Sequence, residues 1–301
     1  PGFMEDSYVD GKIYSIPFQR STMVLYYNKD AFKEVGLDPE APPTTWEELA
    51  EYGQKLTNDG RYGVGIALNS GSAQWAFTGF CLQNSTDGQN LMSEDGKSVY
   101  FNTPENVEAL QFWLDLQNEY KCMAEGIVQW TDLPTQFLAG EVAMIYHTTG
   151  NMANIHDNAD FDFGTAFLPA HKRVGAPTGG GNFYISSNIS EDRVQAAWKF
   201  IKFATSTDRA AQWSLDTGYV ATRQSCFDTD LIKDYYAEVP QASVAYEQLP
   251  YAKPELTTYN AAEIWRVLND NIQAAVVGDM SAQEALDAAQ EQAEEVLSEY
   301  Q

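Results

Sequence analysis

The chain has 301 residues, and its 43 Asp and Glu residues outnumber its 18 Lys and Arg residues, which gives a net charge of −25. A chain of this length exceeds one ordinary hydrophobic core, so we expect two lobes. The acidic excess repels polyanions and no cluster of Lys and Arg offsets it, which argues against nucleic acid as a partner.

The first half of the chain alternates extended and helical patterns. Residues 12–28 are rich in β-branched and aromatic side chains and predict extended structure. Thr45, with Glu48 three residues later, predicts a capping box at the start of a helix that ends at Gly60. We further expect a strand at 62–69, a helix at 104–120 that begins with proline, a short helix at 133–140 and a buried strand at 142–147.

The second half begins with a predicted strand at 163–169, a polar and Gly-rich link at 170–182 and a strand at NFYIS (182–186). Ser281 and Glu284 predict a capping box for the last helix. Helices are expected at 190–204, 207–216, 260–277 and 281–299. Strands that alternate with helices are typical of an α/β architecture.

Motifs for enzyme chemistry are absent from the sequence. It has neither a GxSxG nor an HExxH motif, and its three histidines are scattered, so we expect no catalytic residue, no metal site and no cofactor. The three cysteines lack CxxC spacing, which indicates neither a zinc site nor a disulfide framework. The many carboxylates leave a secreted glycan hydrolase as a remote alternative, because no pair of them stands out.

Four segments together resemble a known protein family. They are GKIYSIPFQRSTMVLYYNKDAFKEVGLDPEAPPTTWEELAEYGQKL (11–56), FLAGEVAMIYHTTGNMANI (137–155), WKFIKFATSTDRAAQWSLDTGYVATR (198–223) and AAEIWRVLNDNIQAAVVGDMSAQEALDAAQEQ (261–292). In this order and spacing they are similar to the extracellular solute-binding proteins of ABC importers, family 1, the group of maltose-binding and glycerol-3-phosphate-binding proteins. The resemblance implies a two-lobe periplasmic-binding-protein-like fold of type II, with the solute held between α/β lobes.

The resemblance also implies a division of the chain. The N-terminal lobe would include residues 1–22 and 177–225, the C-terminal lobe residues 23–168 and 232–301, and the hinge connections residues 169–176 and 226–231. Family members carry a further N-terminal segment, so we expect this chain to lack much of the first lobe. The resemblance places the protein outside the cytoplasm as a partner of permease subunits. The permease, or a lipid anchor outside this chain, would connect it to the membrane.

Polar contacts to the solute are expected where the chain crosses between the lobes. Ser21 lies in the first crossing strand, where family members place a polar ligand contact, although its hydroxyl could instead satisfy the backbone. Arg20 points to the opposite face of an extended strand and ranks lower. Thr148, Thr149 and Gly150 follow a buried strand at its carboxyl end, where ligands sit in open α/β sheets, or they form an ordinary capped turn.

Two glycines and three aromatic residues complete the expected contacts. Gly180 and Gly181 would let backbone N–H groups approach a hydroxyl or a phosphate, or would serve as a hinge link. Tyr219 matches a position that contacts ligand in the glycerol-3-phosphate binders, and Trp75 lies near an aromatic residue of the sugar binders. Trp265 aligns with a tryptophan that stacks on sugar in the maltose binders. For each ring, a place in the core is the alternative.

The segment EIWRVLND (263–270) bears on whether the solute is a sugar or a phosphate. At helical spacing, Trp265 falls at one margin of an apolar stripe and Arg266 points almost away from it. In the glycerol-3-phosphate binders an arginine at the position of Trp265 grips the phosphate, whereas here the arginine is one residue further on. We therefore predict a carbohydrate, a mono- or oligosaccharide, as the solute. The alternative is glycerol-3-phosphate or a glycerophosphodiester with Arg20 or Arg266 as its anion partner.

Overall fold

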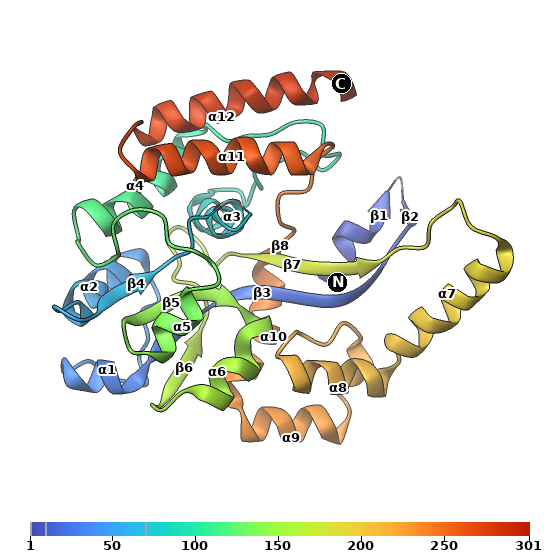
Figure 1. Ribbon diagram of the computed structural model, residues 1–301, viewed down its shortest axis with the longest axis horizontal. Helices are drawn as coiled ribbons and strands as arrows, with labels where there is room; N and C mark the ends of the chain where they lie inside the picture. Colours follow the sequence, from blue (N-terminus) through green and yellow to red (C-terminus); the bar gives the residue numbers. More distant parts are fainter. Residues whose placement is uncertain (1, 10, 70) are drawn as a thin grey trace.

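The computed structural model describes residues 2–9, 11–69 and 71–301 (Figure 1). Its strands form a six-stranded sheet of order β4–β5–β3–β7–β8, in which β6 also pairs with β3, and a two-stranded hairpin. The hairpin joins β1 (Tyr8–Val9) and β2 (Lys12–Ile13). Helices alternate with these strands along the chain, which confirms the predicted α/β architecture.

The longest strand, β3 (Ile16–Asn28), is the axis of the sheet. Its first part pairs antiparallel with β7 (Ala176–Phe183), and its second part pairs antiparallel with β5 (Val142–Thr148) and β6 (Phe163–Ala166). Every residue of β3 from Arg20 onward is buried, as expected for a strand covered on both faces. The sheet is completed by β4 (Tyr62–Gly65), parallel to β5, and β8 (Ala252–Lys253), parallel to β7.

Helices pack on both sides of the sheet (Figure 1). On one side α3 (Ala73–Asn84) contacts β7, and the pair α11 (Ala261–Val276) and α12 (Ala282–Leu297) packs beyond it with α4 (Pro104–Asn118). The other helices are α1 (Lys29–Glu34), α2 (Trp46–Leu56), α5 (Leu133–Leu138), α6 (Met152–Asn158), α7 (Glu191–Ala204), α8 (Thr207–Thr217), α9 (Asp230–Glu238) and α10 (Ser243–Gln248).

Two apolar cores lie on opposite faces of β3. Met23 and Leu25 belong to the larger core, which includes residues of α2, α3, α4, α11 and α12. Val24 and Tyr26 belong to the second core, which includes residues of α5, α6, α9 and α10. Successive residues of a strand point to opposite faces, so the unbroken apolar run of β3 supplies both cores at once.

The predictions for the C-terminal helices are confirmed. Ser281 Oγ accepts the N–H of Glu284 and the Glu284 carboxylate accepts the N–H of Ser281, so α12 begins with the expected capping box. The predicted stripe of α11 is buried at all of its positions, which are Ile264, Leu268, Ile272 and Ala275.

The capping box predicted for α2 is only half present. Thr45 Oγ1 accepts the N–H of Glu48 at 3.1 Å. The Glu48 carboxylate makes its closest hydrogen bonds to the N–H and hydroxyl of Thr44, at 2.7 and 2.8 Å. The helix ends at Leu56, before the predicted end at Gly60.

Two other predictions were wrong in ways that matter for the site. No helix was expected at 73–84, where α3 forms; all of its residues are buried, so it has no polar face to give a helical period. The glycines of the predicted link at 170–182 lie inside β7, because their backbone pairs with β3. The strand expected at 182–186 accordingly ends at Phe183, and the one expected at 62–69 ends at Gly65.

The predicted lobe boundaries stay a prediction, although several structural changes occur near them. The partner of β3 changes from β7 to β5 after residue 22, and β7 begins at Ala176. Residues 226–231, expected as a hinge connection, lie next to α8 and α9. There Cys226 and Ile232 share a small apolar cluster with residues of α8.

Candidate ligand-binding site

Ser21 and Trp75 meet where β3 lies beside β7. Ser21 is 3% exposed and pairs with Gly179 across the sheet. Trp75, on α3, covers Gly179 so closely that a Cβ there would lie 2.8 Å from Trp75 Cζ2. The indole Nε1 donates a hydrogen bond to the carbonyl of Thr178 at 3.0 Å. The missing side chain at residue 179 therefore lets the indole pack on the backbone next to Ser21.

Trp75, Trp130 and His147 form a continuous run of rings. The ring centroids are 5.7 Å apart for Trp75 and Trp130, and 3.8 Å apart for Trp130 and His147. His147 Nε2 also lies 3.3 Å from the carbonyl oxygen of Trp130. Burial lowers the pKa of His147 to about 4, so its imidazole is neutral at physiological pH. Trp75 and His147 are buried and Trp130 is partly exposed, so Trp130 offers an uncharged ring surface suited to an apolar sugar face or a quaternary ammonium group.

The carboxyl end of β5 forms a polar turn against Tyr219. Thr148 Oγ1 accepts the N–H of Gly150 at 3.1 Å, so it does cap the turn. Thr149 is only 1% exposed. Gly150 lies under the Tyr219 ring, where a Cβ would be 2.6 Å from Tyr219 Cζ. The Tyr219 hydroxyl accepts a hydrogen bond from Gln19 Nε2 at 2.7 Å, which ties this turn to β3.

Three buried polar atoms around this turn have no hydrogen-bond partner among the described residues. They are Thr149 Oγ1, Asn151 Nδ2 and Trp213 Nε1. The Trp213 ring stacks near Tyr219, with centroids 6.5 Å apart. A buried polar atom without a partner is costly, and all three groups can donate a hydrogen bond. They would suit the acceptor oxygens of a solute, such as sugar hydroxyls or a phosphate.

Gly180 and Gly181 lie within β7 and are exposed. Gly180 has a φ of +102°, which favours glycine, and a Cβ there would collide with the carbonyl of Gln19. Nothing lies within 4 Å of the corresponding Cβ position at Gly181. The backbone at both positions is therefore accessible, as the predicted contacts require.

Arg20 is directed into the protein. It is 2% exposed, and its guanidinium donates to Asn182 Oδ1 and Thr178 Oγ1, both at 3.3 Å. The guanidinium carbon also lies 5.4 Å from the centre of the Phe3 ring. Its charge is thus engaged within the fold, which makes it a poor anion partner for a solute.

Trp265 and Arg266 diverge on α11 as predicted. Trp265 is half-buried against the larger core, and its Nε1 donates to the carbonyl of Leu256 at 2.6 Å. Only the ring of Trp265 is therefore left for a solute. Arg266 is exposed on the other side and forms ion pairs of 2.7 Å with both Glu263 and Asp270.

Contacts join most of the predicted site residues into one region, which we call the β5–β7 site. Trp265 lies further out: α11 reaches this region where Asn269 Oδ1 accepts the N–H of Gln74, next to Trp75. The β5–β7 site comprises the predicted residues Ser21, Trp75, Thr148, Thr149, Gly150, Gly180, Gly181 and Tyr219.

Sequence reasoning missed several residues of this region. Trp130 lies outside the predicted helices and strands, and the sequence around His147 indicates no role beyond that of a scattered histidine. Gln19, Asn151 and Trp213 carry no motif either. The one available signal was their closeness in sequence to Arg20, Gly150 and Tyr219, respectively.

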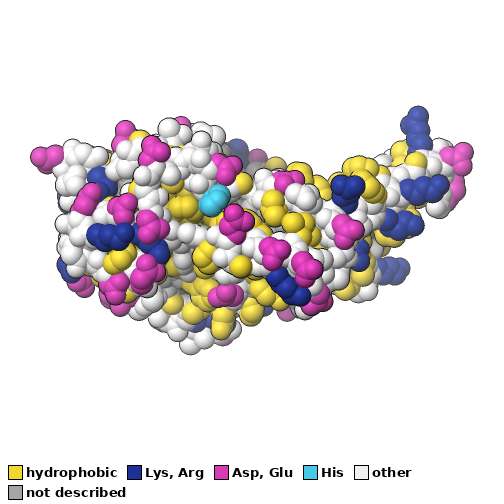
Figure 2. All heavy atoms as spheres, turned by 90° about the horizontal axis from the view of Figure 1, so that it is seen from below, with side chains coloured by type: hydrophobic (Ala, Val, Ile, Leu, Met, Phe, Trp, Pro, Cys, Tyr) yellow, Lys and Arg dark blue, Asp and Glu magenta, His cyan; other side chains and the backbone are white. Residues whose placement is uncertain are grey.

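Some site types and surface features can be described directly. Among the described residues, no group of three or more His, Cys, Asp or Glu could hold a metal ion, and all three cysteines are free and buried. No described helix is both long and apolar enough to cross a membrane. Figure 2 shows acidic side chains scattered over one face and several basic ones on the projecting arm that contains α7.

Comparisons with known proteins give consistent matches. The family model for bacterial extracellular solute-binding proteins matches residues 1–241. The sn-glycerol-3-phosphate-binding periplasmic protein UgpB of Escherichia coli O6:K15:H31 is 30% identical over 100% of this chain and 70% of its own length. UgpB of Salmonella typhimurium is 31% identical over 97% of this chain and 68% of its own length.

Solved structures match the whole described fold. UgpB from Mycobacterium tuberculosis in complex with glycerophosphocholine has a TM-score of 0.87 at 26% identity, covering 99% of this chain and 74% of that one. The cyclic α-maltosyl-1,6-maltose binding protein from Arthrobacter globiformis has a TM-score of 0.83 at 27% identity, covering 99% and 75%. The predicted two-lobe solute-binding fold is thereby confirmed.

Proposed function

Because this chain belongs to the bacterial extracellular solute-binding proteins, we propose that it captures a carbohydrate, a mono- or oligosaccharide, and delivers it to the permease subunits of an ABC importer. In this proposal the protein binds the solute and performs no chemistry on it. The family is extracellular and the matched UgpB relatives are periplasmic, so the protein works outside the cytoplasm.

The observation that best supports a carbohydrate as the solute is that the β5–β7 site combines uncharged rings with hydrogen-bond donors that have no partner. Trp75 and Trp130 supply ring surface, while Thr149 supplies a buried hydroxyl without a partner. Ligand sites commonly combine mostly apolar walls with a few fixed polar groups. Both arginines considered as phosphate partners, Arg20 and Arg266, are engaged within the protein. This combination favours a neutral, polyhydroxylated solute.

We assign roles to the predicted residues on this basis. Trp75, Tyr219 and the ring of Trp265 would contact apolar sugar faces. Hydrogen bonds to hydroxyls would come from Ser21, Thr148, Thr149 and the backbone of Gly150, Gly180 and Gly181.

A glycerophosphodiester is the second candidate, and one observation favours it. The UgpB relatives bind sn-glycerol-3-phosphate by name, and the mycobacterial UgpB structure holds glycerophosphocholine. In this chain the donors of Asn151 and Trp213 would then meet phosphate oxygens, and the Trp75–Trp130 rings would contact a trimethylammonium group. The alternative lacks a free arginine at the site, which is why it ranks second.

Titration calorimetry tests the proposal directly. Monosaccharides, maltose-type oligosaccharides, glycerol-3-phosphate and glycerophosphocholine would be titrated into the 301-residue chain. The proposal expects saturable binding of a sugar. The Thr149→Val and Tyr219→Ala variants should weaken it by about tenfold each, since the first loses a hydroxyl and the second loses the ring at the site. Arg266→Ala is the matched control, because its exposed ion pairs lie on the far side of α11.

Each outcome decides between the candidates. Binding of glycerophosphocholine but of no sugar would replace the carbohydrate with the second candidate. Sugar binding that Thr149→Val and Tyr219→Ala leave unchanged would refute the β5–β7 site. Sugar binding unchanged by Trp265→Ala would remove only Trp265 from it.

A further inference from the structure

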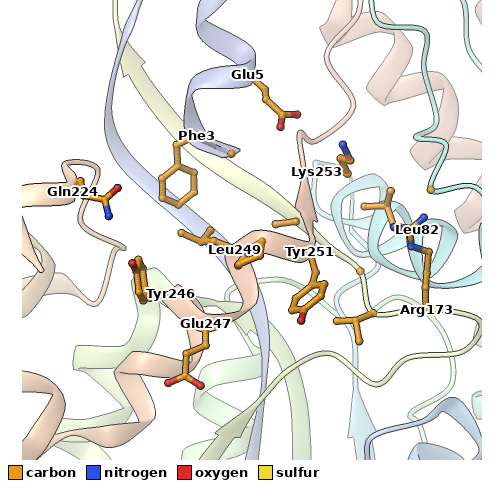
Figure 3. A pocket seen from close by; sticks show the side chains of 16 residues that line it. Phe3, Glu5, Leu82, Arg173, Gln224, Tyr246, Glu247, Leu249, Tyr251 and Lys253 are labelled. Carbon is orange, nitrogen blue, oxygen red and sulfur yellow. The ribbon is translucent and has the colours of Figure 1, made fainter.

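A cavity of about 490 Å³ shares no lining residue with the β5–β7 site (Figure 3). Its walls come from the 3-10 helix η1 (Gly2–Ser7), the end of α3, residues 173–175, Gln224 and the stretch from α10 to β8. Its volume falls within the range of small-molecule sites. It is therefore large enough to be considered as a binding site in its own right.

No residue lines both the cavity and the β5–β7 site, and Phe3 of the cavity lies on the side of β3 to which Arg20 points. Phe3 lines the cavity and contacts the guanidinium of Arg20. Arg20 and Ser21 are successive residues of β3 and so point to opposite faces. A molecule bound in the cavity would not occupy the position proposed for the transported solute.

The middle of the cavity is apolar and partly aromatic. Phe3, Leu249 and Tyr251 lie between its two ends in Figure 3. Tyr251 is 51% exposed, an unusual amount for a large ring, and it faces open space rather than core. Tyr246 is held in place by stacking on Phe227, with ring centroids 4.1 Å apart. A flat or aliphatic body would cover these surfaces.

The two basic residues and Glu247 lie at opposite ends of the cavity. Arg173 and Lys253 lie together on one side with Leu82, whereas Glu247 lies on the other side next to Tyr246 (Figure 3). Glu5, the second acidic residue of the lining, lies on the same side as Lys253 in Figure 3. The lining thus holds two basic and two acidic side chains, although the whole chain has 43 acidic and 18 basic residues.

The two basic side chains have few competing partners. Among the described residues, no side-chain hydrogen bond or ion pair engages Arg173 or Lys253, although Asp87 interacts electrostatically with Arg173. Lys253 is fixed at its backbone by pairing with Pro177 of β7. Both cations are thus available to an anionic group of a ligand.

We propose that this cavity binds a small zwitterion with an apolar middle. Its carboxylate or phosphate would lie between Arg173 and Lys253, its ring or aliphatic body would rest on Phe3 and Tyr251, and its cationic group would face Glu247. Separated charges suit this cavity better than a simple anion, because the protein as a whole carries a charge of −25.

A matched set of three probes tests this proposal by titration calorimetry. 4-(Aminomethyl)benzoate carries both charges, 4-methylbenzoate lacks the ammonium group, and benzylamine lacks the carboxylate. We expect 4-(aminomethyl)benzoate to bind most tightly. Lys253→Ala and Arg173→Ala should each weaken its binding by about fivefold, and Glu247→Gln should weaken it without affecting 4-methylbenzoate.

Two controls separate this cavity from the β5–β7 site and from nonspecific charge effects. Lys199→Ala removes an exposed cation on α7 and should leave probe binding unchanged. Thr149→Val alters the proposed transport site and should also leave it unchanged. The proposal is overturned if no probe binds saturably at millimolar concentration. Binding that Lys253→Ala and Arg173→Ala do not alter would overturn it equally.

Discussion

Gly150 leaves no room for a side chain beneath Tyr219. A Cβ there would lie 2.6 Å from Tyr219 Cζ, so Gly150→Ala must displace the ring and its hydrogen bond from Gln19. We expect a destabilisation of about 1–3 kcal/mol, as for other overpacked sites, and a loss of solute affinity of about tenfold or more. Urea unfolding and calorimetry measure the two effects.

Gly60→Ala is the matched control for this substitution. The nearest atom to its Cβ position is Asn58 Oδ1 at 3.8 Å, an ordinary contact distance, and Gly60 lies outside the β5–β7 site. The stability and affinity of this variant should stay close to those of the unaltered chain. Equal losses for Gly150→Ala and Gly60→Ala would contradict the packing argument.

His147 predicts a pH dependence of stability. Burial lowers its pKa in the folded chain from 6.5 to about 4, so the unfolded chain binds the proton more readily. The contribution is fully present above about pH 6.5, declines as the pH falls, and is lost below about pH 4. Between pH 7.5 and 4.5, protonation of His147 lowers the free energy of unfolding by about 2–3 kcal/mol.

Two histidine variants separate the effect of His147 on pH-dependent stability from the effect of the carboxylates. His147→Gln should lose less stability than the unaltered chain on going from pH 7.5 to 4.5, as measured by urea unfolding at both values. His156→Gln, at an exposed position on α6, should follow the unaltered chain. Parallel pH curves for all three proteins would rule out His147 as the cause.

At the scale of single elements, the caps of the helices differ in a testable way. Ser281 and Glu284 form a complete capping box for α12. Ser281→Ala should therefore destabilise the protein by about 1 kcal/mol in urea unfolding. Ser190 occupies the same position before α7 but makes no side-chain capping hydrogen bond, so Ser190→Ala should change stability by a few tenths at most. A reversed order would contradict the assignment.

The elements also show how far the sequence could predict the fold. Amphipathic helices such as α11 and α12 were predicted within a few residues, because one polar face gives a helical period. Buried α3 has no polar face, so its sequence AQWAFTGFCLQN has no such period. Gly179, Gly180 and Gly181 are typical of a loop, and only pairing with β3, distant in the sequence, makes them part of a strand.

At the scale of the whole molecule, the β5–β7 site is assembled from segments that are far apart in the sequence. The family resemblance indicated Ser21 and Tyr219, and the carboxyl end of a predicted strand indicated Thr149, each one separately. It did not indicate that Trp130 stacks between Trp75 and His147, because Trp130 lies outside the regular elements and its position depends on contacts across the chain. Residues whose role arises only from such contacts cannot be read from local pattern.

The arm that contains α7 gives the protein a surface that predicts self-association (Figure 1). Of the fourteen residues of α7, only Ile201 is buried. Phe200 and Phe203 are each 57% exposed, and Trp198 is 40% exposed. Apolar surface of this kind favours contact between copies. The net charge of −25 makes copies of the chain repel one another. This repulsion is strong at 0.01 M salt, where the Debye length is about 30 Å, and weaker at 0.15 M salt, where the Debye length is about 8 Å.

We therefore expect the 301-residue chain to associate more strongly as salt is raised, in a concentration-dependent way that light scattering can follow. The double variant Phe200→Ser, Phe203→Ser should remain monomeric over the same range of salt. Tyr62→Ser removes a ring that is 42% exposed on β4 and should associate like the unaltered chain. If both variants behaved alike, the association would have to arise elsewhere, because charge screening acts on every surface whereas the apolar contact belongs to α7.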